Sequence, residues 1–251
     1  MLAYNESSIP GTTLAERLSL ALAENLALEV ANTSDCQVEL YQGLKVVTVQ
    51  AYKMHEFHPL HPETAVRQAA FSHVQETLEL AARLNAPRIL TVCGFGFEII
   101  DRPLECCLEF FHSLVPIAKS LGIRMMIEPL SPLRAGAFTD PKDPKDVIKL
   151  MAMLNEPSVF GLAIDTGHLL DSGINLNDFF LNWQFPIEEL QLKGARSTPP
   201  DPTIPLTVWL ENLPQIPNVI CVEHRQSISL PNFRELINWV RRSQLANDIF
   251  G

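Results

Sequence analysis

Short apolar runs alternate with amphipathic runs along the whole chain, at intervals of about 30 residues and without a linker or a break in composition. Strands that alternate with helices in this way form right-handed βαβ crossovers and a parallel sheet. Eight such units in 251 residues predict one α/β domain, a closed (β/α)8 TIM barrel that spans residues 1–251.

The predicted elements follow the period of the apolar residues. β-Branched and apolar residues predict strands at 2–5, 27–31, 45–52, 88–94, 124–128, 159–165, 187–193 and 218–223. Helical spacing predicts the longest helices at 63–85, 103–121 and 232–246.

Four of the predicted strands carry polar side chains at their carboxyl ends: Glu128, Asp165, Gln191 with Lys193, and Glu223. In a (β/α)8 barrel the carboxyl ends of the strands meet at one rim, where the active site lies. Side chains alternate along a strand, so these residues are predicted to face the barrel interior, while Ile127, Ile164, Leu192 and Val222 face the helices.

Three carboxylates close together cannot all stay ionised in a dry pocket without a positive partner. A divalent cation is the natural partner, because oxygen ligands suit Mg²⁺ or Mn²⁺. The strand ends therefore predict a metal site, although a helix cap is the commoner role of an aspartate after a strand.

Composition narrows the function classes. A net charge of -10 argues against a nucleic-acid partner, because such binding depends on lysine and arginine at phosphates. No apolar run approaches the roughly 18 residues of a membrane span, which predicts a cytoplasmic protein that does not enter membranes. The five cysteines lack a CxxC spacing, which favours reduced, mostly buried thiols.

The stretch Asp165-Thr166-Gly167-His168, the strand-end acids Glu128 and Glu223, and the strand ending in Lys193 resemble the xylose isomerase-like TIM barrels, a family of sugar isomerases, epimerases and related dehydratases. The resemblance implies that one divalent ion is held by Glu128, Asp165, Gln191 and Glu223. It also implies that the two glutamates are the catalytic acid and base, in an order that stays open.

The same resemblance implies which residues contact a small sugar-like substrate. His168 would bond a substrate oxygen, and Lys193 and Arg196 would help to bind the substrate. His58 and His61, in a segment rich in histidine and proline, are further candidates for contact with substrate, although a surface loop explains them as well. Relatives often form dimers or tetramers, so a homo-oligomer is compatible with the resemblance.

Gln191 departs from the family pattern, which has a histidine ligand at this place. An amide oxygen coordinates hard cations and offers no imidazole nitrogen, so Mn²⁺ or Mg²⁺ is expected rather than Zn²⁺, bound weakly or not at all. In an empty site, Lys193 or Arg225 would have to compensate the acids, or one acid would be protonated.

The resulting prediction is a metal-dependent sugar or sugar-phosphate isomerase or epimerase that moves a proton between adjacent carbons. The first alternative is a metal-dependent dehydratase of a polyol or keto acid. The second is a metal-free, non-catalytic barrel that binds a small ligand or a protein, which Gln191 suggests directly. An endonuclease is a weaker third alternative, because this chain has few histidines and an acidic surface.

Overall fold

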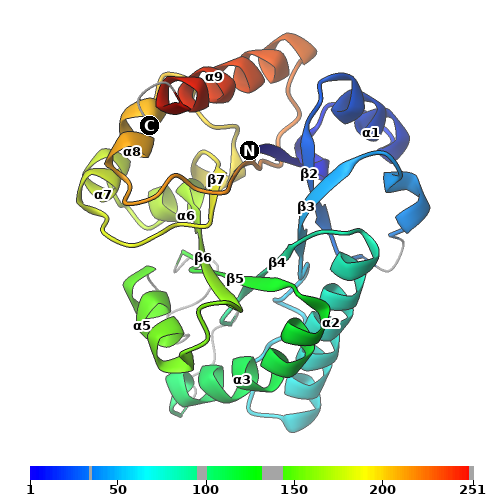
Figure 1. The fold of residues 1–251 in the computed structure, drawn as a ribbon, viewed down its shortest axis with the longest axis vertical. Coiled ribbons are helices and arrows are strands. Elements are labelled where there is room, and N and C mark those ends of the chain that lie inside the picture. Colours follow the sequence, from blue (N-terminus) through cyan, green and yellow to red (C-terminus); the bar gives the residue numbers. More distant parts are fainter. Residues whose placement is uncertain (34–35, 95–100, 132–143, 249–251) are drawn as a thin grey trace.

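A computed structural model describes residues 1–33, 36–94, 101–131 and 144–248. Eight parallel strands form a closed barrel in chain order, with helices around it (Figure 1), which confirms the predicted fold. The strands are β1 (Leu2–Asn5), β2 (Ala27–Ala31), β3 (Lys45–Gln50), β4 (Arg88–Val92), β5 (Arg124–Glu128), β6 (Phe160–Asp165), β7 (Glu189–Leu192) and β8 (Val219–Val222). The barrel closes because β1 pairs with both β2 and β8.

The α-helices that lie around the barrel are α1 (Leu14–Ala23), α2 (Thr64–Arg83), α3 (Pro103–Leu121), α5 (Pro144–Leu154), α6 (Thr166–Asp171), α7 (Leu176–Asn182), α8 (Leu206–Asn212) and α9 (Leu230–Asp248). Their ends follow the sequence. Thr13 and Glu16 form a capping box at the start of α1, and α3 begins at Pro103 and ends at Gly122, whose φ of 67° is left-handed. No helix among the described residues is long and apolar enough to cross a membrane.

The alternation of side chains across the strands separates two kinds of core. Ile127, Ile164, Leu192 and Val222 belong to the large apolar cluster between the barrel and its helices. Met126 and Ala163 pack in a separate small cluster with Leu90, and Cys221 packs in another with residues of β1, β2, β3 and β8. The predicted division between inward and outward positions is therefore confirmed.

Two boundaries at the rim differ from the prediction. The strand β7 ends at Leu192 rather than at Lys193, so the lysine lies just beyond the sheet. Helix α6 starts at once after β6, because the Asp165 carboxylate accepts hydrogen bonds from the backbone N–H groups of Gly167, at 2.7 Å, and His168, at 3.4 Å. Asp165 is thus the cap of a helix and also a residue of the polar rim.

Candidate active site at the barrel rim

A cavity of about 390 Å³ opens at the carboxyl ends of the strands, a size that suits a small organic molecule. Four of the residues predicted for the site line it, namely Glu128, His168, Lys193 and Glu223. The loop after β3 contributes much of the remaining wall, and Arg225 lies on the β8 side. Sequence reasoning did not place the β3 loop residues Tyr52, Lys53, Met54 and His55 in this wall.

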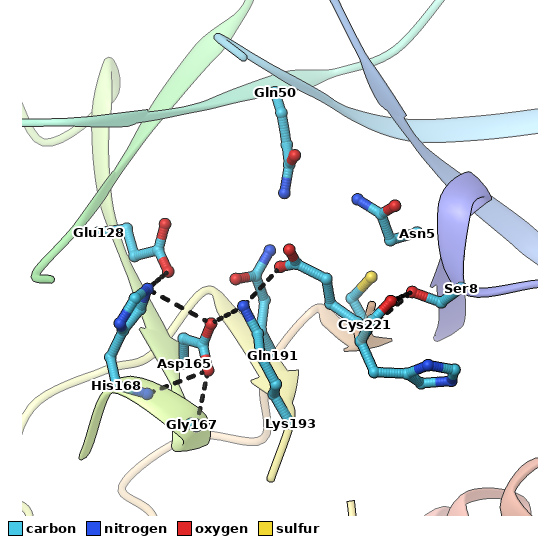
Figure 2. A network of polar contacts seen from close by, with 12 residues as sticks. Asn5, Ser8, Gln50, Glu128, Asp165, Gly167, His168, Gln191, Lys193 and Cys221 are labelled. Atoms are coloured by element: carbon cyan, nitrogen blue, oxygen red, sulfur yellow. Dashed lines mark hydrogen bonds and ion pairs between the residues drawn. The ribbon is translucent and has the colours of Figure 1, made fainter. Parts of the chain in front are cut away.

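Lys193 lies among the acids. Its ammonium nitrogen is 2.5 Å from Asp165 Oδ2 and 3.2 Å from Glu223 Oε2, and its side chain is only 7% exposed. Figure 2 shows the lysine nitrogen beside the Asp165 carboxylate, with dashed lines to acids on two sides. The ammonium therefore joins acids at the ends of β6 and β8 in a nearly dry environment.

The backbone around Lys193 is held by the start of α6. Thr166 Oγ1 accepts a hydrogen bond from Lys193 N at 2.8 Å and donates one to Lys193 O at 2.7 Å. A Cβ atom on Gly167 would lie 2.9 Å from Gly194 O and 3.0 Å from Lys193 Cγ, so α6 approaches the end of β7 as closely as a glycine allows. The position of the lysine is thus built into the junction of the two elements.

His168 faces the two acids of β5 and β6. Its Nε2 atom lies 3.5 Å from Glu128 Oε1 and 3.7 Å from Asp165 Oδ2, and all three residues are buried. Glu128, Asp165 and His168 each present one ligand atom within 4.8 Å of the others, a spacing that could hold one metal ion. Glu223 lies on the other side of Lys193.

The surroundings shift the pKa values of Glu128, Asp165 and Lys193 in different directions. Burial raises the pKa of Glu128 well above its usual value, and the neighbouring Asp165 raises it further. Burial also opposes ionisation of Asp165, but the Lys193 ammonium and then His168 outweigh it, so the pKa of Asp165 is lowered. Burial favours the neutral form of Lys193, but Asp165 and Glu223 outweigh it and raise the pKa of the lysine. These shifts favour a proton on Glu128 beside an Asp165–Lys193 ion pair.

Gln191 belongs to a second polar layer inside the barrel. Its Nε2 atom donates to Glu29 Oε2 at 2.8 Å, and the other oxygen of Glu29 accepts from Asn5 and Gln50, each at 2.9 Å. Burial and then Glu189 raise the pKa of Glu29 well above its usual value. Gln191, predicted as a metal ligand, thus has its amide nitrogen bonded to Glu29. Nothing local in the sequence indicates that Asn5 and Gln50 converge on Glu29 as well.

Five of the predicted residues are absent from the lining of the cavity: Asp165 and Gln191, described above, and Arg196, His58 and His61. His58 and His61 each accept a backbone hydrogen bond on Nδ1, from Leu60 and Glu63 respectively, both at 3.1 Å. They therefore stabilise the turns of their own loop, which agrees with the alternative that this segment is a surface loop. The backbone N–H of Arg196 donates to Asp171 Oδ1 at 2.9 Å, which ties its loop to the end of α6.

The donor set was compared with the needs of a divalent ion. Such an ion lies about 2.1 Å from a carboxylate oxygen, so an ion on Asp165 Oδ2 would be less than about 5 Å from Lys193 Nζ. At an effective dielectric constant of about 20, charges of +2 and +1 at about 5 Å repel by about 7 kcal/mol. With Lys193 in this position, its ammonium opposes a divalent ion, although the oxygens of the acids would suit one.

Comparison with known proteins agrees with this architecture. The family model described as xylose isomerase-like TIM barrel matches residues 36–243. No curated protein sequence matches the chain closely enough to count as a relative.

Solved structures share the fold at low sequence identity. One is the apo form of 3-keto-D-glucoside 4-epimerase, YcjR, from E. coli, with 12% identity, coverage of 97% of this chain and 98% of that one, and a TM-score of 0.72. A D-tagatose 3-epimerase-like protein has 15% identity, coverage of 100% and 99%, and a TM-score of 0.73. The IOLI protein, whose structure contains a zinc atom, has 13% identity, coverage of 98% and 96%, and a TM-score of 0.66.

Proposed function

We propose that this chain, which belongs to the xylose isomerase-like TIM barrel family, is a sugar isomerase or epimerase that moves a proton on the carbon beside a carbonyl group. Epimerases of sugars or keto-glucosides occur among the proteins with the same fold, which supports this reaction class. The observation that carries the proposal is the placement of Glu128 and Glu223, at the ends of β5 and β8, in one cavity that Lys193 also lines.

Glu223 is proposed as the base. Its carboxylate lines the cavity and lies 3.2 Å from the Lys193 ammonium. It would remove the hydrogen beside the substrate carbonyl as a proton, and the electron pair of the C–H bond would move to the carbonyl oxygen, forming an enediolate.

Glu128 is proposed as the acid. Burial raises the pKa of this carboxyl group well above its usual value, which favours the protonated form that can donate to the enediolate. Donation to the same carbon from the other face gives an epimer. Donation to the former carbonyl carbon, with the proton of the adjacent hydroxyl group passing to the former carbonyl oxygen, gives an isomer. Each turnover leaves Glu223 protonated and Glu128 ionised, and exchange with water restores the starting state.

The remaining groups bind and orient the substrate. His168 lines the cavity beside Glu128, where it can hydrogen-bond a substrate hydroxyl group. The cavity volume of about 390 Å³ suits a monosaccharide, so the proposed partner is a small sugar-like molecule rather than a nucleic acid. Arg225 and Lys53 in the wall offer positive charge to a phosphate group if the sugar carries one.

Deuterium exchange tests this function. Ketohexoses and 3-keto glucosides would be incubated with the protein in D₂O, and the loss of the proton beside the carbonyl group followed by NMR. The wild-type protein should catalyse exchange and form a new epimer or isomer. Glu223→Gln should lose both activities, and Glu128→Gln should retain exchange without forming the epimer, because only the base is left.

Glu156→Gln is the matched control, because Glu156 forms a surface ion pair with Lys119 away from the cavity. The proposal is wrong if wild type and the Glu223→Gln variant exchange at the same rate. Loss of water from the substrate would instead identify the dehydratase alternative. Binding of these sugars without exchange would identify the non-catalytic one.

A further inference from the structure

The Lys193 ammonium lies where the acids of the rim would otherwise share a metal ion. It contacts Asp165 at 2.5 Å and Glu223 at 3.2 Å, and the two carboxylates come from the ends of different strands. Glu128, the third acid, lies beside His168 in Figure 2. The ammonium can therefore compensate the negative charge of the clustered acids, as a bound metal ion would.

The lysine is held there by more than its own charge. Both backbone polar groups of Lys193 bond the Thr166 hydroxyl group, and the side chain is almost fully buried. The first carbons of the Lys193 side chain pack closely against Gly167. They have room there because glycine has no Cβ, and a Cβ at this position would lie 3.0 Å from Lys193 Cγ. These contacts distinguish Lys193 from a surface lysine that visits a nearby acid.

We propose that Lys193 is an internal cation that replaces the divalent ion at this site and polarises the substrate oxygen itself. An ammonium group has three N–H donors, and that of Lys193 forms ion pairs with two acids, Asp165 and Glu223. Because the lysine also lines the cavity, a donor that the two acids do not use can bond the carbonyl oxygen of a substrate. It would stabilise the negative charge that collects on this oxygen when Glu223 removes the proton.

Gln191 has an amide oxygen that could act as a further ligand if the lysine were absent. Its nitrogen is committed to Glu29, whereas its Oε1 atom is buried and accepts no hydrogen bond from the described residues. In Figure 2 this oxygen lies on the side of Asp165 and Glu128. Removal of the ammonium would leave Asp165 and Glu223 without their shared cation. One oxygen of Glu128 lies within 4.8 Å of one of Asp165, so the acids offer oxygen donors of the kind that suits Mn²⁺.

The catalytic part of this inference depends on the proposed function, but occupation of the site by Lys193 does not. Titration of Mn²⁺ into chelator-treated protein, followed by calorimetry, therefore tests the occupation alone. Lys193→Met should bind Mn²⁺ at least about 100-fold more tightly than wild type, because a repelling charge is removed from among the ligands. Lys193→Arg, which keeps the charge, should bind no more tightly than wild type.

The double variant Lys193→Met with Glu223→Gln should lose the gained affinity if the ion uses the rim acids. Lys193→Gln provides a second neutral variant should the methionine variant fold poorly, and circular dichroism checks both. Stoichiometric Mn²⁺ binding by wild type with the affinity of the neutral variants would overturn the inference. So would neutral, folded variants that bind no more tightly than wild type. Neither result depends on whether the protein turns over a sugar.

Discussion

Replacement of Glu29 should reveal how firmly Gln191 is committed to the barrel interior. The two oxygens of the Glu29 carboxyl group accept three hydrogen bonds, from the buried amides of Asn5 and Gln191 and the partly buried amide of Gln50. Glu29→Leu removes both acceptor oxygens and leaves the three amides without this partner. Glu29→Gln keeps one oxygen as an acceptor for Asn5 and Gln50. Its new amide nitrogen can donate to the Oε1 atom of Gln191 after the side-chain amide of Gln191 rotates by about half a turn.

The two variants should therefore differ widely in stability. Each buried donor without a partner costs about 1–3 kcal/mol, so the two buried amides together with the partly buried one cost about 5 kcal/mol. Burial of the leucine side chain returns about 2–3 kcal/mol. Glu29→Leu is expected to be about 3 kcal/mol less stable than wild type, which lowers Tm by roughly 6–12 °C in a chain of this size. Glu29→Gln should stay within about 1 kcal/mol of wild type.

Urea unfolding followed by circular dichroism measures both differences. The comparison is valid when the three proteins share one m-value, because equal slopes indicate the same exposed surface on unfolding. Equal stability of Glu29→Leu and Glu29→Gln would refute the assignment of Gln191 to a structural network. Gln191 would then be free to serve as a metal ligand beside the rim acids.

Three further predictions concern the surroundings of the site. Gly167→Ala should lower the free energy of unfolding by about 1–3 kcal/mol, because the added Cβ would lie 2.9 Å from Gly194 O. Thermal unfolding measures this loss, and an unchanged Tm would show that the junction of α6 and β7 is loosely packed. The pKa of His73 is lowered mainly by burial, so the stability it contributes is present above about pH 6.5, the pKa expected in the unfolded chain, and is lost as pH falls toward the folded pKa. His73→Gln should accordingly weaken the loss of Tm on acidification, and identical pH profiles would contradict this account. In the folded protein a thiol reagent should modify Cys36 and Cys106 before the buried Cys93, Cys107 and Cys221, and mass spectrometry that finds early labelling of Cys221 would contradict the buried placement.

Much of the barrel could be predicted because its determinants are local and periodic. Inward and outward residues alternate along β5 to β8, so the sequence pattern alone assigns Met126 and Ile127 to different sides of the barrel wall. The rim acids could be predicted for the same reason, since each lies where a strand ends. Strand and helix ends were misplaced by a few residues, as at Lys193, where the chain leaves the sheet to bond Thr166.

The interior polar contacts could not be predicted, because they join residues far apart in the chain. Asn5, Gln50 and Gln191 meet at Glu29 only after the barrel closes. Likewise, the sequence presents Asp165 and Lys193 as separate strand ends, and either could have faced a metal ion or a substrate. Their ion pair depends on the distance between the ends of β6 and β7, which no local pattern encodes.

The central claim is that a lysine, rather than a divalent ion, supplies the positive charge for proton transfer in this barrel. It is tested most directly by deuterium exchange into a ketose substrate by chelator-treated protein, measured with and without added Mn²⁺. The account predicts the same exchange rate in both samples and loss of exchange in Lys193→Met without Mn²⁺. Exchange that appears in the wild-type protein only when Mn²⁺ is added would contradict it.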